Sequence, residues 1–85
     1  MQLSFKERTA RDLREGDEGV LERIDLPADD AQRLMEVGFV PGLRIVAAGS
    51  APGGCPRVYR VDGAEFALRC ETAERLILRT RGGDE

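Results

Sequence analysis

A segment near the middle of the chain, residues 29–42, carries signals for both ends of a helix and for the turn that follows it. Asp29, with Gln32 three residues later, has the spacing of a capping box, which predicts that Asp29 is the N-cap. Gly38 stands where a helix ends on a left-handed residue. Pro41-Gly42 then favours a type II turn, which requires glycine at its third position. The segment therefore predicts one helix followed directly by a strand.

The predicted helix has one apolar side. Ala31, Leu34 and Met35 recur at the i, i+3 and i+4 spacing that places side chains on a single helical face. Leu34 would also contact Phe39, the hydrophobic pair that commonly accompanies a Schellman helix end. We therefore expect this face, including Met35, to pack against a sheet.

The second strong signal is a hairpin at residues 61–64, where Asp-Gly favours a type I′ turn of two residues. Such a turn sets the strand register, so Tyr59 should lie opposite Phe66 and Arg60 opposite Glu65. Alternation then separates a face toward the core from a solvated face. The predicted core face holds Tyr59, Val61, Ala64, Phe66 and Leu68, and the predicted outer face holds Val58, Arg60, Glu65, Ala67 and Arg69.

The remaining segments predict short strands and helical turns around this hairpin. Further strands are expected at 20–26, 43–48 and 76–80, helical turns at 9–12 and 70–75, and a loop at 49–56. About five short antiparallel strands in so small a chain avoid exposed edges best by curling into a barrel. We predict a mainly β protein with an SH3-like barrel and one inserted helix. It would form one domain over residues 1–85, with its core at 13–80 and a flexible tail at 81–85.

Composition excludes several functional classes. The 85 residues include 13 basic and 16 acidic side chains, a net charge of −3, which argues against a nucleic-acid binder. No apolar run approaches the ~18 residues of a membrane span, and the amino terminus has no signal-peptide pattern. We therefore expect a cytoplasmic protein that is not itself in the membrane. No histidine is present to act as a general base, and no catalytic constellation is found, so we predict that the protein is not an enzyme.

The cysteines, Cys55 and Cys70, are the candidate metal ligands. In the cytosol they are expected to be reduced thiols. They lack C-x-x-C spacing and have no histidine to complete a site, so packing as small apolar residues competes with weak binding of Fe²⁺ or Zn²⁺. Asp29, Asp30 and Glu36 flank the predicted helix, where the helix dipole accounts for acids in the first turn. No cofactor is required on this interpretation.

Charged residues on the hairpin are candidates for partner binding. Arg57, Arg60 and Arg69 are expected to line its outer face. Because Glu65 lies opposite Arg60, part of this charge is already neutralised. A solvated face and a surface for an acidic partner are the two interpretations that remain.

Motifs along the chain resemble, in the same order, those of FeoA-domain proteins. They are Leu13-(x2)-Gly16-(x2)-Gly19-Val20, Leu34-(x3)-Gly38-Phe39-(x)-Pro41-Gly42, Pro52-Gly53-Gly54-(x)-Pro56, Tyr59-Arg60-Val61 with Gly63, Phe66-Ala67-Leu68-Arg69 and Ala73-(x3)-Ile77. The set covers residues 13–79. Cys55 departs from the pattern, because the family more often carries an acidic or other polar residue there.

The resemblance implies an SH3-like barrel and a role as a cytosolic accessory of bacterial ferrous iron uptake. The implied partner is FeoB, a membrane transporter with a cytosolic GTPase domain, which this chain would bias through contact. The expected contact surface is the exposed edge of the central helix and its turn, followed by the arginine face. The candidate contact residues are Arg33, Glu36, Val40, Arg57, Arg60 and Arg69.

Two other functions remain open. Family domains are described as binding transition metals, and they are similar to the SH3-like domain of diphtheria-toxin-repressor-type iron regulators, so a metal sensor or carrier is the main alternative. A module that binds peptides in an aromatic groove is weaker, because Tyr59 and three phenylalanines supply few aromatic side chains. Leftover strand edges would also permit a homodimer.

Overall fold

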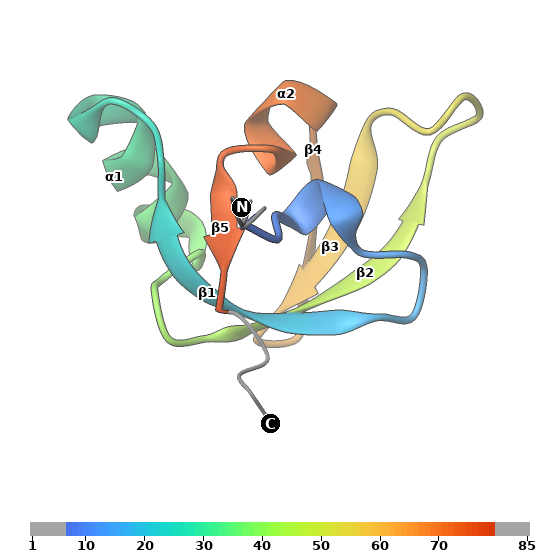
Figure 1. Cartoon of the computed structure of the whole chain (residues 1–85), viewed down its shortest axis with the longest axis horizontal. Helices are drawn as coiled ribbons and strands as arrows, with labels where there is room; N and C mark the ends of the chain where they lie inside the picture. The colour runs from blue at the N-terminus through green and yellow to red at the C-terminus, as the bar shows by residue number, and fades with distance from the viewer. Residues whose placement is uncertain (1–6, 80–85) are drawn as a thin grey trace, which may run out of the picture.

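The computed structural model describes residues 7–79, which form a five-stranded antiparallel sheet with two helices (Figure 1). The strand order is β4-β3-β2-β1-β5, and the described strands leave the sheet open between β4 and β5. The mainly β, SH3-like prediction is thus confirmed, with a sheet that is not closed. The elements are η1 (Ala10–Asp12), β1 (Glu18–Ile24), α1 (Ala28–Val37), β2 (Arg44–Ser50), β3 (Arg57–Val61), β4 (Ala64–Leu68), α2 (Cys70–Ala73) and β5 (Leu76–Leu78).

The amino-terminal end of α1 differs from the prediction. The helix begins at Ala28, with Pro27 as its N-cap and no side-chain capping bond, and the Ala31 amide donates to the Pro27 carbonyl at 2.9 Å. β1 has already ended at Ile24, and Pro27, with φ −56° and an extended ψ of 152°, is the last residue before the helix. Its missing amide costs no hydrogen bond there, because the first amides of a helix have no partner within it. Asp29 therefore lies in the first turn, and Gln32 donates to Glu36 at 3.3 Å. The capping-box prediction is wrong.

The carboxyl end of α1 is as predicted. Gly38 has φ 125°, its amide donates to the Met35 carbonyl at 3.1 Å, and the Phe39 amide donates to the Leu34 carbonyl at 3.0 Å. This pair of bonds is the Schellman pattern. Of the predicted inward residues, Ala31 is buried and Leu34 packs on the core, whereas Met35 is 40 % exposed. Phe39, directly after the helix, has no exposed surface and belongs to the core.

The hairpin has the predicted register throughout. Tyr59 pairs with Phe66, and Arg60 pairs with Glu65. Asp62 and Gly63, at the turn, have φ of 53° and 84°, as a type I′ turn requires. The remaining pairs are Arg57 with Leu68, Val58 with Ala67 and Val61 with Ala64.

The core lies between the curved sheet, η1 and α2. Its buried members include Ala10, Leu13, Leu21, Phe39, Ile45, Ala47, Tyr59, Val61, Ala73, Leu76 and Leu78. The Tyr59 hydroxyl donates a hydrogen bond of 2.8 Å to the Ala10 carbonyl and so links η1 to β3. The predicted helical turns at η1 and α2 are confirmed. The first strand ends at Ile24, two residues earlier than expected, and Thr80 of the expected last strand lies outside the described residues.

Candidate partner-binding surface

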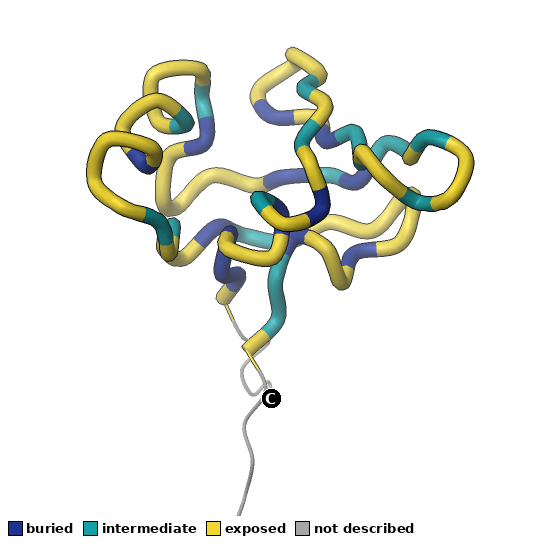
Figure 2. Tube along the Cα trace, turned by 90° about the horizontal axis from the view of Figure 1, so that it is seen from above, coloured by how far each residue is buried: buried dark blue, intermediate teal, exposed yellow. Residues whose placement is uncertain are grey.

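One stretch of chain supplies the large hydrophobic side chains that residues 7–79 leave exposed. These are Met35, Val37, Val40 and Leu43, with 40, 50, 39 and 40 % of their surfaces exposed. They follow one another from the last turn of α1 through the type II turn to the start of β2, and Figure 2 shows most of α1 as exposed. We call these four residues the apolar edge. All four belong to residues 35–43, and exposed apolar side chains that form a contiguous patch are a common feature of protein–protein contact sites.

A cavity of about 310 Å³ opens between α1 and α2. Its apolar lining comes from Leu26 and Leu34, which are half-buried, while Asp30, Arg33 and Thr72 supply polar groups. α1 and α2 flank this space on the same side of the sheet (Figure 1). The combination of an apolar floor and a charged rim is suited to holding one apolar side chain of a partner and orienting its polar neighbours.

Three predicted contact residues on α1 and its turn lie beside these features. Arg33 lines the cavity, Val40 belongs to the apolar edge, and Glu36 is exposed between them in sequence. No local sequence signal marks the other apolar-edge residues or Thr72 as contact residues. The spacing of Met35 predicts a core position, and only the approach of α2 to α1 brings Thr72 to the cavity.

The predicted arginine face is correct for two of its three members. Arg60 and Arg69 are exposed, and Arg60 forms an ion pair with Glu65 at 2.6 Å. Arg57 instead lies on the same side of β3 as Tyr59, where its guanidinium donates to the Leu13 carbonyl and its Nε is buried. Alternation along the strand places residues 57, 59 and 61 on one face, so the assignment of Arg57 to the outer face is wrong.

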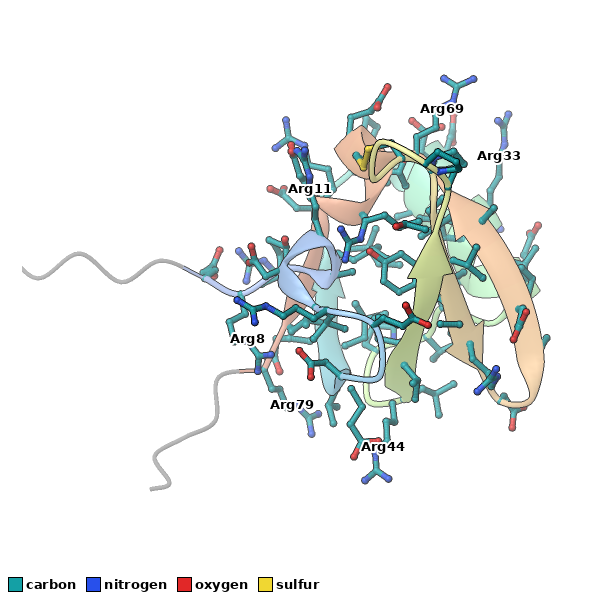
Figure 3. All side chains as sticks on the ribbon, turned by 90° about the vertical axis from the view of Figure 1, so that its right-hand side faces the viewer. Arg8, Arg11, Arg33, Arg44, Arg69 and Arg79 are labelled. Carbon is teal, nitrogen blue, oxygen red and sulfur yellow. A yellow bond between two sulfur atoms is a disulfide. The ribbon has the colours of Figure 1, made fainter. Side chains whose placement is uncertain are left out.

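Two of the predicted contact arginines, Arg33 and Arg69, remain available for a partner. Among residues 7–79, neither Arg33 nor Arg69 has a carboxylate within ion-pair distance. Both side chains extend toward the same end of the molecule in the view of Figure 3. An unpaired guanidinium at the surface can add a charge-assisted hydrogen bond to a partner carboxylate without first breaking an internal pair.

The cysteines form a disulfide between the loop at 51–56 and the first residue of α2, with Cα atoms 5.7 Å apart (Figure 3). The expectation of two reduced thiols is wrong for this structure, because the fold brings Cys55 and Cys70 within bonding distance. A sulfur in a disulfide is not a thiolate, so neither residue could ligate a metal in this form. Within residues 7–79, no three Cys, Asp or Glu side chains gather to form a metal site.

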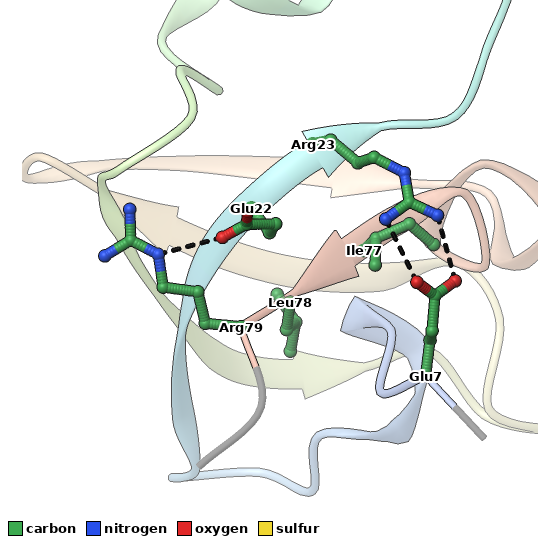
Figure 4. A pocket seen from close by; sticks show the side chains of 6 residues that line it. All are labelled: Glu7, Glu22, Arg23, Ile77, Leu78 and Arg79. Atoms are coloured by element: carbon green, nitrogen blue, oxygen red, sulfur yellow. Dashed lines mark hydrogen bonds and ion pairs between the residues drawn. The ribbon is translucent and has the colours of Figure 1, made fainter. Parts of the chain in front are cut away.

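A second pocket, of about 420 Å³, lies beside β1 and β5 and is lined partly by ion pairs (Figure 4). Arg23 donates two hydrogen bonds of 3.0 Å to the Glu7 carboxylate, and these raise the pKa of Arg23. Arg79 donates one hydrogen bond of 3.0 Å to the Glu22 carboxylate. The four charged groups neutralise one another in pairs. This pocket is therefore a weaker candidate for a charged partner than the surface around α1.

Neither α1 nor α2 has the length and apolar character needed to cross a bilayer, and residues 7–79 contain no other α-helix.

The chain matches known sequences and structures of one family. The FeoA domain model matches residues 8–80. FeoA of Stenotrophomonas maltophilia, solved with zinc, is 34 % identical, with a TM-score of 0.73 over 85 % of this chain and 89 % of that one. That protein is described as a prokaryotic SH3-domain protein and proposed as a ferrous iron transport activating factor. No curated protein sequence matches this chain.

More distant structures share the fold. FeoA of Chlorobium tepidum is 26 % identical, with a TM-score of 0.81 over 92 % of this chain and 74 % of that one. A manganese-dependent transcriptional repressor, solved with manganese, is 18 % identical, with a TM-score of 0.76 over 92 % of this chain and 38 % of the repressor. At that identity, the repressor likeness concerns the fold alone.

Proposed function

Because the chain belongs to the FeoA-domain family, which is associated with ferrous iron transport, we propose that it is a non-enzymatic accessory that binds the cytosolic part of an FeoB-type transporter. The hydrolysis of GTP and the passage of iron would belong to the transporter. This chain would act from the cytoplasm by favouring one conformation of the partner over another, which requires only a difference in affinity between the two.

Two observations carry this proposal: the exposed apolar edge, and the cavity between α1 and α2. Interfaces commonly have an apolar centre and a polar rim, and a few central side chains supply most of the affinity. Val40 and its apolar neighbours would provide the centre, while Arg33 and Glu36 would provide the rim. Arg60, on β3, and Arg69, directly after β4, are both exposed and would form a second, more polar contact surface.

The test is calorimetric titration of the full chain against the cytosolic domain of the partner, with and without GTP and Fe²⁺. We expect saturable binding whose affinity depends on the nucleotide. Val40→Asp should weaken binding by about tenfold or more, because it places a charge at the centre of the contact. Ser50→Asp is the matched control: it adds the same charge at an exposed position on the far end of β2.

The outcomes test the proposed transporter binding and the proposed contact surface separately. Absence of saturable binding in every nucleotide state would contradict the proposed function. Binding that is equally sensitive to Val40→Asp and Ser50→Asp would contradict the proposed surface and direct attention to Arg60 and Arg69. Sedimentation of the free protein in the same buffer would report whether it forms a homodimer. The outer edge of β4, which pairs with no further strand among residues 7–79, would permit one.

The second candidate is a metal sensor or carrier that binds Fe²⁺ or Zn²⁺. The observation that favours it is the zinc in the structure of the Stenotrophomonas maltophilia relative. Cys55 and Cys70 would be ligands only as reduced thiolates, so the titration with Fe²⁺ requires reducing conditions. Stoichiometric binding that disappears in the Cys55→Ser, Cys70→Ser double variant would support this function, and equal binding by that variant would refute a cysteine site.

A further inference from the structure

The two residues of the Cys55–Cys70 disulfide differ in their exposure to solvent. Cys55 belongs to an exposed loop, whereas Cys70 is only 6 % exposed. Thiol–disulfide exchange requires a thiolate to reach one of the two sulfurs directly, so attack from solution is directed to Cys55. We propose that this disulfide is a reversible redox-modification site, opened at Cys55 by dithiol reductants, with Cys70 as the leaving sulfur. This inference does not depend on the proposed function.

The exchange is balanced in two steps. A thiolate of the reductant attacks Cys55 Sγ, the Cys55–Cys70 bond breaks, and Cys70 leaves as a thiolate that takes a proton from water. The second thiol of the reductant, as its thiolate, then attacks the mixed disulfide and releases Cys55, which is protonated in turn. The protein disulfide gains two electrons and two protons, and the reductant becomes a disulfide. An oxidised dithiol carries the reaction in reverse.

The environment of Cys70 favours the protonated thiol over the thiolate once the disulfide is broken, because the sulfur is buried and lies beside a carbonyl oxygen. Its Sγ lies 3.4 Å from the carbonyl oxygen of Gly54. A disulfide sulfur has no proton to donate, whereas the thiol formed by reduction can donate a weak hydrogen bond to that carbonyl. The reduced cysteine thus has a partner in place, so reduction leaves no buried polar group without a contact at this position.

Reduction should loosen the loop and leave α2 in place. The hydrogen bonds of the loop, Ala51 N to Pro56 O at 3.0 Å and Gly54 N to Ala51 O at 2.8 Å, are internal to it. The disulfide is the covalent link that joins this loop to α2. α2, by contrast, is held by the buried side chain of Ala73, and the adjoining Glu74 forms an ion pair with Arg11. The disulfide therefore restrains the loop against α2 and is not needed to hold the core together.

The first experiment uses the full chain in non-denaturing buffer, with dithiothreitol as the reductant, and counts alkylated cysteines by intact mass. We expect no label before reduction and two labels after it, with the folded spectrum retained. Amide hydrogen exchange at Gly54 should become about tenfold faster or more on reduction, while exchange at Leu78 changes by less than about twofold. Reoxidation should restore the slow exchange at Gly54.

The second experiment compares single variants under the same alkylating conditions. Cys70→Ser leaves the Cys55 thiol and Cys55→Ser leaves the Cys70 thiol, so each variant is the control for the other. We expect Cys55 to react about tenfold faster than Cys70, because of its greater exposure. Two labels before any reductant, equal or reversed alkylation rates, or loss of the whole fold on reduction would each overturn the proposal.

Discussion

Replacing Tyr59 with phenylalanine removes one hydrogen bond and leaves a buried ring of nearly the same shape in the core. Tyr59 has no exposed surface, and its hydroxyl donates to the Ala10 carbonyl at 2.8 Å. The cost depends on whether that carbonyl loses its only partner. It does not, because the Leu13 amide also donates to it at 3.1 Å. We therefore expect a loss of about 1 kcal/mol, the ordinary net value of one hydrogen bond, and not the larger penalty of an orphaned acceptor.

The measurement is urea unfolding of the wild type and the Tyr59→Phe variant, followed by circular dichroism. A loss of about 1 kcal/mol in a chain of this size corresponds to a fall in the melting temperature of about 4–8 °C. Tyr59→Leu is the control, since it also removes ring volume and should cost more. A loss above about 3 kcal/mol for Tyr59→Phe would refute the argument that the Leu13 amide continues to satisfy Ala10.

The same side chain gives a prediction at alkaline pH. Burial raises the pKa of Tyr59 above its ordinary value of 10.0, and the nearby Arg57 guanidinium opposes this effect without reversing it. In the unfolded chain the phenol titrates near its ordinary value, so this contribution to stability is complete below pH 10 and is lost as pH rises through the higher pKa of the folded state. Tyr59 is the only tyrosine and the chain has no tryptophan, so tyrosinate absorbance reports on this residue alone. Tyr59→Phe should flatten the fall in stability above pH 10; an unchanged slope would contradict the burial argument.

Three further substitutions test other parts of the structure by urea unfolding. Gly19→Ala should lower the free energy of unfolding by about 1–3 kcal/mol, because the new Cβ would lie 2.9 Å from Cδ1 of the buried Leu78. An unchanged free energy would show that the Leu78 side chain moves freely. Asp62→Ala should cost about 1 kcal/mol, because φ is 53° there and alanine tolerates that region poorly; Asp62→Gly, which relieves the restriction, should not be destabilising. Arg60→Ala should cost less than about 1 kcal/mol, since its ion pair with Glu65 is 51 % exposed on each side; a larger loss would give that pair a role the structure does not indicate.

Local stereochemistry explains which features the sequence could predict. The hairpin register follows from Asp62-Gly63, because few turns of two residues are compatible with the twist of the strands, and a shift of one residue would reverse both faces. The end of α1 follows from Gly38 for a similar reason, since a left-handed residue there lets the next amides bond back to the helix. These signals act over a few residues and do not depend on what packs nearby. The ordered family motifs, for their part, correctly identified the fold and the FeoA domain.

The remaining features depended on contacts between distant segments. The spacing of Met35 fits an inward-facing helical position, but in the folded chain only Ala31 of that face is buried and Leu34 partly so, whereas Met35 is 40 % exposed and joins the apolar edge. The disulfide required Cys55 and Cys70 to meet through the approach of a loop to α2. The candidate cavity exists because α1 and α2, far apart in sequence, lie on the same side of the sheet (Figure 1). Backbone sterics act within a few residues and fix the turns, the carboxyl end of α1 and the strand register, so the sequence predicts these features. Which side chains are buried depends on packing between distant segments, so that feature is defined only in the folded chain.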